Sequence, residues 1–178
     1  NMGQGLPRAM AVAGVPVTSI SDLEGYGVMK RLEQEQLRDK ALQAFKDIYG
    51  QASGSGVVAE YIRKTGLDVL RGADMLSEVA ENYNSTVEYA DNSIAKSLRD
   101  VARIHLSGLG TRIFYTNHGG YDTHANEMPA HPKLISDLSG AISDFIDDLE
   151  EHEAADDVAI LVFTEFGRRM RDNGSGTD

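Results

Sequence analysis

The chain contains no cysteine, and this absence excludes three kinds of site. Without cysteine there is no disulfide framework, no zinc site built on thiolates and no cysteine nucleophile among these residues. The redox compartment stays open, because a cysteine-free chain is compatible both with the cytoplasm and with an oxidising compartment.

Long apolar runs are absent as well. No window approaches the roughly 18 consecutive apolar residues that a membrane-spanning helix needs, and no charged segment followed by an apolar one opens the sequence. We therefore expect a soluble chain without a membrane span. The first residue is Asn1 and the last residues are N-G-S-G-T-D, a turn-rich sequence, so we also expect both ends to be cut from a longer protein.

Positive charge is scarce. The 178 residues include 17 Lys and Arg against 28 Asp and Glu, which gives a formal net charge of -11. Binding to nucleic acid needs clustered Lys and Arg that neutralise phosphates, so we exclude a nucleic-acid partner. A hydrophobic content of 41% with 25% charged residues is typical of a globular domain with a real core.

The first ninety residues predict a mainly helical region that serves as a cap or as packing helices. One helical pattern runs from about residue 29 to 49, and a second covers residues 57–82 with a weak point at Gly66 or Gly72. The sequence Q-A-S-G-S-G separates the two. No Gly-Lys-Ser/Thr follows it, so we interpret it as a linker between helices and not as a phosphate-binding loop.

Residues 91–178 are patterned differently and predict a βαβ unit within the same domain. Helical spacing from residue 94 ends at G-L-G, and the apolar segments 111–116 and 158–163 have the character of strands. Between them lies a helix whose apolar stripe is formed by Leu134, Leu138, Ala141, Ile142, Phe145 and Leu149. A strand, a helix and a strand in succession predict parallel strands, with ligands bound beyond their carboxyl ends.

The densest polar motif is N-H-G-G-Y-D-T-H at residues 117–124, directly after the first of these strands. Asp122 and His124 are two residues apart, so in an extended segment their side chains share one side and can reach one ion. Mixed nitrogen and oxygen ligation suits zinc, manganese or iron better than calcium. The residues alone leave three interpretations open: a metal site, a catalytic loop without metal, and a capped polar turn.

A longer run around this motif resembles a known family. The run G-L-G-T-R-I-F-Y-T-N-H-G-G-Y-D-T-H-A-N-E, followed by T-E-F-G-R-R and N-G-S-G-T-D, is similar over about residues 90–178 to the bacterial family labelled domain of unknown function 1501. That family is placed with the alkaline-phosphatase-like and sulfatase-like metalloenzymes. The resemblance therefore implies a fragment of a three-layer α/β/α sandwich, and a hydrolase of phosphate or sulfate esters that uses two divalent ions, zinc or manganese. Its members often carry a twin-arginine leader, which implies export to the periplasm.

The resemblance also assigns roles to individual residues. It makes Asp122 and His124 the expected metal ligands, and the terminal G-T-D matches the start of a Gly-Thr-Asp-His-Gly motif, so Asp178 is a third. Arg168 is a candidate contact to a substrate oxyanion, although an arginine after a strand also suits a surface ion pair. The residues expected to orient the ligands are Glu165, His118 and His131, each with a local structural role as its alternative.

Two classes of function remain. In the first, the complete protein is a metal-dependent ester hydrolase whose nucleophile lies outside this chain, so the chain alone holds half a metal centre and is inactive. In the second, it is a non-catalytic exported protein that keeps the fold, and with it a structural ion, for binding or assembly. Neither class defines the substrate.

A run of acidic residues without Lys or Arg lies near the end of the predicted helix. No calcium-binding loop pattern is present in it, so we expect these side chains to be solvated. The run consists of Asp144, Asp147, Asp148, Glu150, Glu151, Glu153, Asp156 and Asp157.

Overall fold

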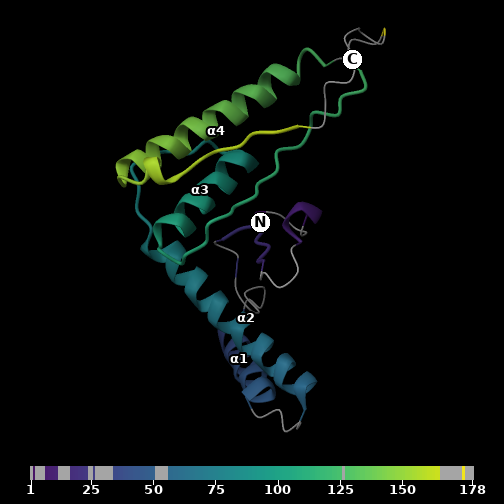
Figure 1. Cartoon of the computed structure of the whole chain (residues 1–178), viewed down its shortest axis with the longest axis vertical. Coiled ribbons are helices and arrows are strands. Elements are labelled where there is room, and N and C mark those ends of the chain that lie inside the picture. Colours follow the sequence, from purple (N-terminus) through teal and green to yellow (C-terminus); the bar gives the residue numbers. More distant parts are fainter. Residues whose placement is uncertain are drawn as a thin grey trace. The chain divides into compact units, whose positions relative to one another are not determined.

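The computed structural model describes the chain at residues 2, 7–11, 17–23, 26, 34–50, 56–125, 127–164 and 174, and the ordered elements are helices (Figure 1). The chain divides into two compact units, one of residues 1–19 with 84–178 (unit 1) and one of residues 20–83 (unit 2). In chain order the elements are η1 (Arg8–Met10), α1 (Glu35–Gly50), α2 (Val57–Asn82), α3 (Ser93–Leu106), α4 (His131–Glu151) and η2 (Ala155–Asp157).

The core of unit 1 is the contact between α3 and α4. Ala95 and Ala141 have no exposed surface, and such small side chains let two helix backbones approach closely. Phe145 and Leu149 are almost completely buried one turn apart on α4. Burying side chains of this size contributes about 1.5–3 kcal/mol each. The apolar stripe predicted from the sequence is therefore the face with which α4 packs.

Local signals in the sequence set the ends of these two helices. The side chain of Asn92 accepts a hydrogen bond of 2.9 Å from the backbone N–H of Ala95, which caps α3. After Leu106 the chain turns at Gly108, whose φ of +71° is readily adopted only by glycine. Pro132 lies in the first turn of α4, where its missing N–H costs no helical hydrogen bond. The helices expected at residues 94–109 and within the stripe are thus confirmed.

In unit 2, α1 packs against α2. The start of α2 at Val57 and its end at Asn82 agree with the prediction, whereas the expected start of the preceding helix near residue 29 and most of the linker lie outside the described residues. Gly66 and Gly72 do not interrupt α2. A Cβ at Gly66 would lie 2.2 Å from Cδ1 of Tyr49, so this glycine lets the aromatic ring lie against the backbone of α2.

The predicted α/β sandwich with parallel strands is wrong. In the part of the chain that the structure describes, segments 111–116 and 158–164 are extended but form no sheet, and Thr116 makes an isolated parallel bridge to Met2. Leu161 is 83% exposed and Phe163 is 67% exposed. The apolar pattern identified extended chain correctly, but a strand also needs a neighbour for its N–H and C=O groups, and the described residues supply almost none.

Among the helices that the structure describes, none is both long enough and apolar enough to cross a lipid bilayer.

The two glycines of α2 provide a matched test of the contact with Tyr49. We expect Gly72→Ala to raise the free energy of unfolding by about 0.5–1 kcal/mol, because alanine favours the helix and nothing lies within 4 Å of the new Cβ. Gly66→Ala makes the same helical gain but must displace the Tyr49 ring, so we expect it to lower stability relative to Gly72→Ala. Urea unfolding followed by circular dichroism measures both. Equal gains in the two variants would contradict the close packing at Gly66.

Candidate functional site

The motif loop, residues 117–125, is held just before its first residue and again at Gly120. On its N-terminal side, the backbone N–H of Met2 donates to the carbonyl oxygen of Tyr115 at 2.8 Å, next to the bridge at Thr116. Within the loop, Gly120 has a φ of +100°, and a Cβ there would lie 3.3 Å from the side chain of Leu134 on α4. Glycine at this position therefore provides both the backbone conformation and the close approach to α4.

Asp122 and His124 are brought together, although by a turn and not by the expected extended segment. Oδ1 of Asp122 lies 3.3 Å from Nε2 of His124, and the two side chains are 71% and 86% exposed. The backbone N–H of Thr123 donates to the carbonyl oxygen of Tyr121 at 3.0 Å, which tightens the turn that presents this pair. Both groups are thus accessible from solvent and point to the same small volume.

The residues expected to orient the ligands are centred on Tyr121. Its hydroxyl lies 3.0 Å from Nδ1 of His118 and 3.4 Å from the carbonyl oxygen of Leu134. The rings of His118 and His131 both meet the Tyr121 ring edge to face, with centroids 5.4 and 6.1 Å away. Desolvation, and then the nearby charge of Asp137, raise the pKa of Tyr121, so its hydroxyl keeps its proton as a hydrogen-bond donor.

His131 has a second partner that the sequence did not indicate. Its Nδ1 lies 3.2 Å from Oε1 of Glu127, and the two side chains are partly exposed. When a carboxylate accepts a hydrogen bond from Nδ1–H of an imidazole, the lone pair of that ring is placed on Nε2. The spacing of four residues at the start of a helix was the signal that could have identified Glu127.

The remaining predicted site residues are not part of the described structure. Glu165, Arg168 and Asp178 lie outside the described residues. Within the described part of the chain, no third imidazole or carboxylate joins Asp122 and His124 in a group able to hold a metal ion.

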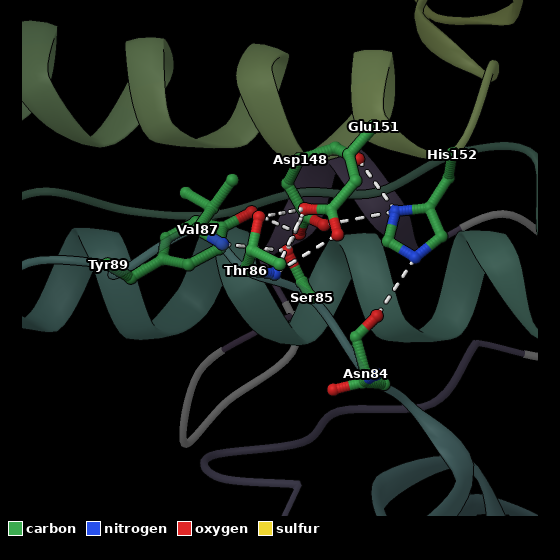
Figure 2. A network of polar contacts seen from close by, with 8 residues as sticks. All are labelled: Asn84, Ser85, Thr86, Val87, Tyr89, Asp148, Glu151 and His152. Atoms are coloured by element: carbon green, nitrogen blue, oxygen red, sulfur yellow. Dashed lines mark hydrogen bonds and ion pairs between the residues drawn. The ribbon is translucent and has the colours of Figure 1, made fainter.

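One group of three possible ligands does occur, at the end of α4. Asp148, Glu151 and His152 have ligand atoms within 4.8 Å of one another (Figure 2). Their spacing of three and four residues places them on one face of the helix. Asp148 is completely buried, although the sequence predicted that the whole acidic run is solvated. That prediction is wrong for Asp148, which continues the inward-facing stripe at Phe145 by three residues.

Glu151 binds the segment that precedes α3. Its carboxylate accepts hydrogen bonds from Oγ of Ser85 at 2.9 Å, from the backbone N–H of Thr86 at 3.0 and 3.1 Å, and from Oγ1 of Thr86 at 3.1 Å. The bond from the Thr86 backbone is the largest cause that lowers the pKa of Glu151. Each of these partners donates to a carboxylate, so the ionised form of Glu151 is the one that the network stabilises.

Two further carboxylates extend this attachment along the same segment. The hydroxyl of Tyr89 donates to Oδ2 of Asp148 at 2.6 Å, and the backbone N–H of Ala90 lies 3.4 Å from Oδ2 of Asp144. Residues 85–90 are therefore fastened to α4 by side chains of the acidic run. Figure 2 shows Ser85, Thr86 and Tyr89 of this segment beside Asp148 and Glu151 of the helix.

The chemistry of these groups argues against a metal ion at the end of α4. Nδ1 of His152 lies 2.8 Å from the carbonyl oxygen of Asp148, and Nε2 lies 3.0 Å from the carbonyl oxygen of Asn84. A ring nitrogen needs a free lone pair to bind a metal, whereas both nitrogens of His152 already face carbonyl oxygens of the protein. The Glu151 oxygens already accept from the protein. We conclude that Asp148, Glu151 and His152 form a structural polar network.

The structure and the site define a class: a helical protein whose loop between α3 and α4 presents an exposed aspartate and histidine. The family model described as "Protein of unknown function (DUF1501)" matches residues 15–178, so the chain belongs to this family. This confirms the family resemblance noted from the motif. No curated protein and no solved structure matches the chain.

Because the segment before α3 is held by the ionised carboxylate of Glu151, the stability of the fold should fall at low pH. The folded state lowers the pKa of Glu151. The stability that Glu151 contributes is therefore fully present above about pH 4.3, the ordinary pKa of glutamate in an unfolded chain, and is lost as pH falls through the lower pKa of the folded state. We expect Glu151→Gln to lower the melting temperature at pH 6, and the difference from wild type to shrink between pH 5 and pH 3. Glu150→Gln, one residue away, is the control. A difference that stays constant down to pH 3 would contradict this role.

Proposed function

We propose that Asp122 and His124 are ligands of a divalent metal ion, zinc or manganese, in a hydrolase that acts on phosphate or sulfate esters. The observation that carries this proposal is the separation of 3.3 Å between Oδ1 of Asp122 and Nε2 of His124. Both side chains extend from a loop whose backbone is fixed against α4, so the donor atoms are held near one another while remaining accessible.

The separation fits two ligands of a single ion. Zinc takes imidazole nitrogen and carboxylate oxygen at about 2.0–2.2 Å in tetrahedral sites, so neighbouring ligand atoms lie about 3.3–3.5 Å apart. The two donor atoms of the motif loop match that distance. One nitrogen and one oxygen also suit manganese, whereas calcium prefers oxygen ligands alone. Asp178 is the third ligand that the motif resemblance supplies.

The class of reaction comes from the family resemblance: G-G-Y-D-T-H is similar to the Gly-Gly-aromatic-Asp-Thr-His motif of a family that is placed with the alkaline-phosphatase-like metalloenzymes. In such a centre the bound ions polarise the ester and activate the attacking group. The residues of this chain position the site. Tyr121 ties the loop to the Leu134 carbonyl, and the Glu127 carboxylate directs the lone pair of His131 to Nε2, where it can accept a proton. Glu165 and Arg168 remain candidates for orienting a ligand and for binding a substrate oxyanion.

Zinc and manganese titrations of the chain test the proposal. We expect Zn²⁺ to perturb the ring signals of His124 in NMR spectra, and Mn²⁺ to broaden the signals of residues 121–125. Asp122→Ala and His124→Ala should each weaken zinc binding at least about tenfold in calorimetry, because each removes one ligand. The matched control Thr123→Ala changes the residue between them and should stay within about twofold of wild type.

Two further measurements separate the alternatives. His152→Gln should leave zinc binding unchanged if the ion binds at the motif loop, and should weaken it if the end of α4 is the site. A screen of phosphate and sulfate monoesters with added zinc or manganese then tests for hydrolysis. If neither ion perturbs Asp122 or His124 in the wild-type chain, the loop is structural, and a non-catalytic role in binding or assembly becomes the better explanation.

A further inference from the structure

His152 is held in a way that only one of its protonation states satisfies. Nδ1 faces the carbonyl oxygen of Asp148 at 2.8 Å, and Nε2 faces the carbonyl oxygen of Asn84 at 3.0 Å (Figure 2). A carbonyl oxygen accepts hydrogen bonds and cannot donate them. Neutral imidazole has one N–H and one lone pair, so it bonds one of these carbonyls and directs its lone pair at the other. The imidazolium ion has two N–H groups and bonds both.

The charges around the ring favour the same state. Oδ1 of Asp148 lies 3.3 Å from Nδ1 of His152, and that carboxylate is completely buried while the imidazole is 28% exposed. Glu151 also acts on the ring by its charge. From the neighbouring elements, segment 84–90 contributes Tyr89, whose hydroxyl donates to Asp148, and η2 adds two exposed carboxylates, Asp156 and Asp157. All charged groups named here are acids, and Asp148 and Glu151 act on the ring by their charges, so they stabilise a cation.

The hydrogen bonds and these charges all raise the pKa of His152. The bond to the Asp148 carbonyl is the largest cause that raises the pKa of His152, with the bond to Asn84 and the two acids adding to it and desolvation opposing it. The stabilisation of the fold by His152 is therefore complete below about pH 6.5, the ordinary pKa of histidine in an unfolded chain. It is lost as pH rises through the higher pKa that His152 has in the folded state.

The residue that His152 holds lies at a division of the fold. Asn84 is the first residue of unit 1 after the chain leaves unit 2 at Tyr83. The residues that follow it are fastened by Glu151, Asp148 and Asp144, which are acidic. At Asn84 the bonding group is the base His152. Its bond is therefore lost when pH rises, whereas the bonds to the acids are lost when pH falls.

We propose that His152 is a pH-operated latch, which as the imidazolium ion fastens Asn84 to the end of α4 and releases it when the proton is lost. Nδ1 faces both the Asp148 carbonyl oxygen at 2.8 Å and the buried Asp148 carboxylate at 3.3 Å, so the neutral ring keeps its proton on Nδ1 and turns a lone pair to Asn84. The bonds of Glu151 to Ser85 and Thr86 persist at that pH, because their loss requires acid. Release at alkaline pH therefore affects the first residue of the segment and leaves the rest attached. The latch makes the attachment of Asn84 to the end of α4 depend on pH.

The decisive experiment is a pH titration of the wild-type chain by NMR. With histidine labelled by ¹⁵N, we expect both ring nitrogens of His152 to carry protons at pH 6, and a midpoint above about 6.5. The ¹³C signal of the Asn84 carbonyl should shift with the same midpoint, since it loses a hydrogen bond in that step. A ring with a single N–H at pH 6, or an Asn84 carbonyl that does not respond between pH 6 and pH 9, would overturn the proposal.

Two variants add a thermodynamic readout. We expect His152→Gln to melt about 2–4 °C below wild type at pH 6, and this difference to disappear as pH approaches 9. Asn84→Ala keeps the backbone carbonyl that His152 binds, so it should keep the pH response of wild type. A deficit in His152→Gln that is independent of pH would show a packing role in place of a latch. If that variant does not fold, the wild-type titration still decides.

Discussion

Close packing of α3 on α4 is the constraint on which the rest of unit 1 depends. Alanines without exposed surface let the two backbones approach, and Phe145 and Leu149 fill the remaining contact. The same two helices bound the motif loop, which follows α3 after a short extended segment and leads into α4. Acidic side chains next to the apolar stripe of α4 fasten residues 85–90, the segment that leads into α3. One helix thus organises the core, the polar network and the loop.

Much of this could be predicted because it depends on neighbours in sequence. The ends of α2 and the packed face of α4 followed from helical periodicity, since residues three and four apart share a side. The proximity of Asp122 and His124 was also predicted, although a turn and not an extended segment produces it. Gly66 was the exception among local features. A glycine inside a helical pattern predicts a weak point in the helix, whereas Gly66 accommodates the Tyr49 ring of another helix.

The features that the sequence did not predict are those that join distant residues. Segments 111–116 and 158–164 have the composition of strands, but pairing is decided by whichever chain lies alongside, and the described residues form one isolated bridge. The hydrogen bond between Ser85 and Glu151 joins residues 66 positions apart in the sequence, and the one between Asn84 and His152 joins residues 68 positions apart. No local pattern contains both partners. A buried acid in the inward-facing stripe, such as Asp148, was the available sign that polar partners would be found inside.

The hydrogen bond from Tyr121 to the carbonyl of Leu134 has a consequence for how a ligand is received. Together with the contact of Gly120 on the Leu134 side chain, it attaches the motif loop to the first turn of α4 before anything binds. The conformational entropy of ordering the loop is therefore lost during folding and not during binding. A ligand that meets Asp122 and His124 finds their backbone already in place, so it has only two exposed side chains to immobilise.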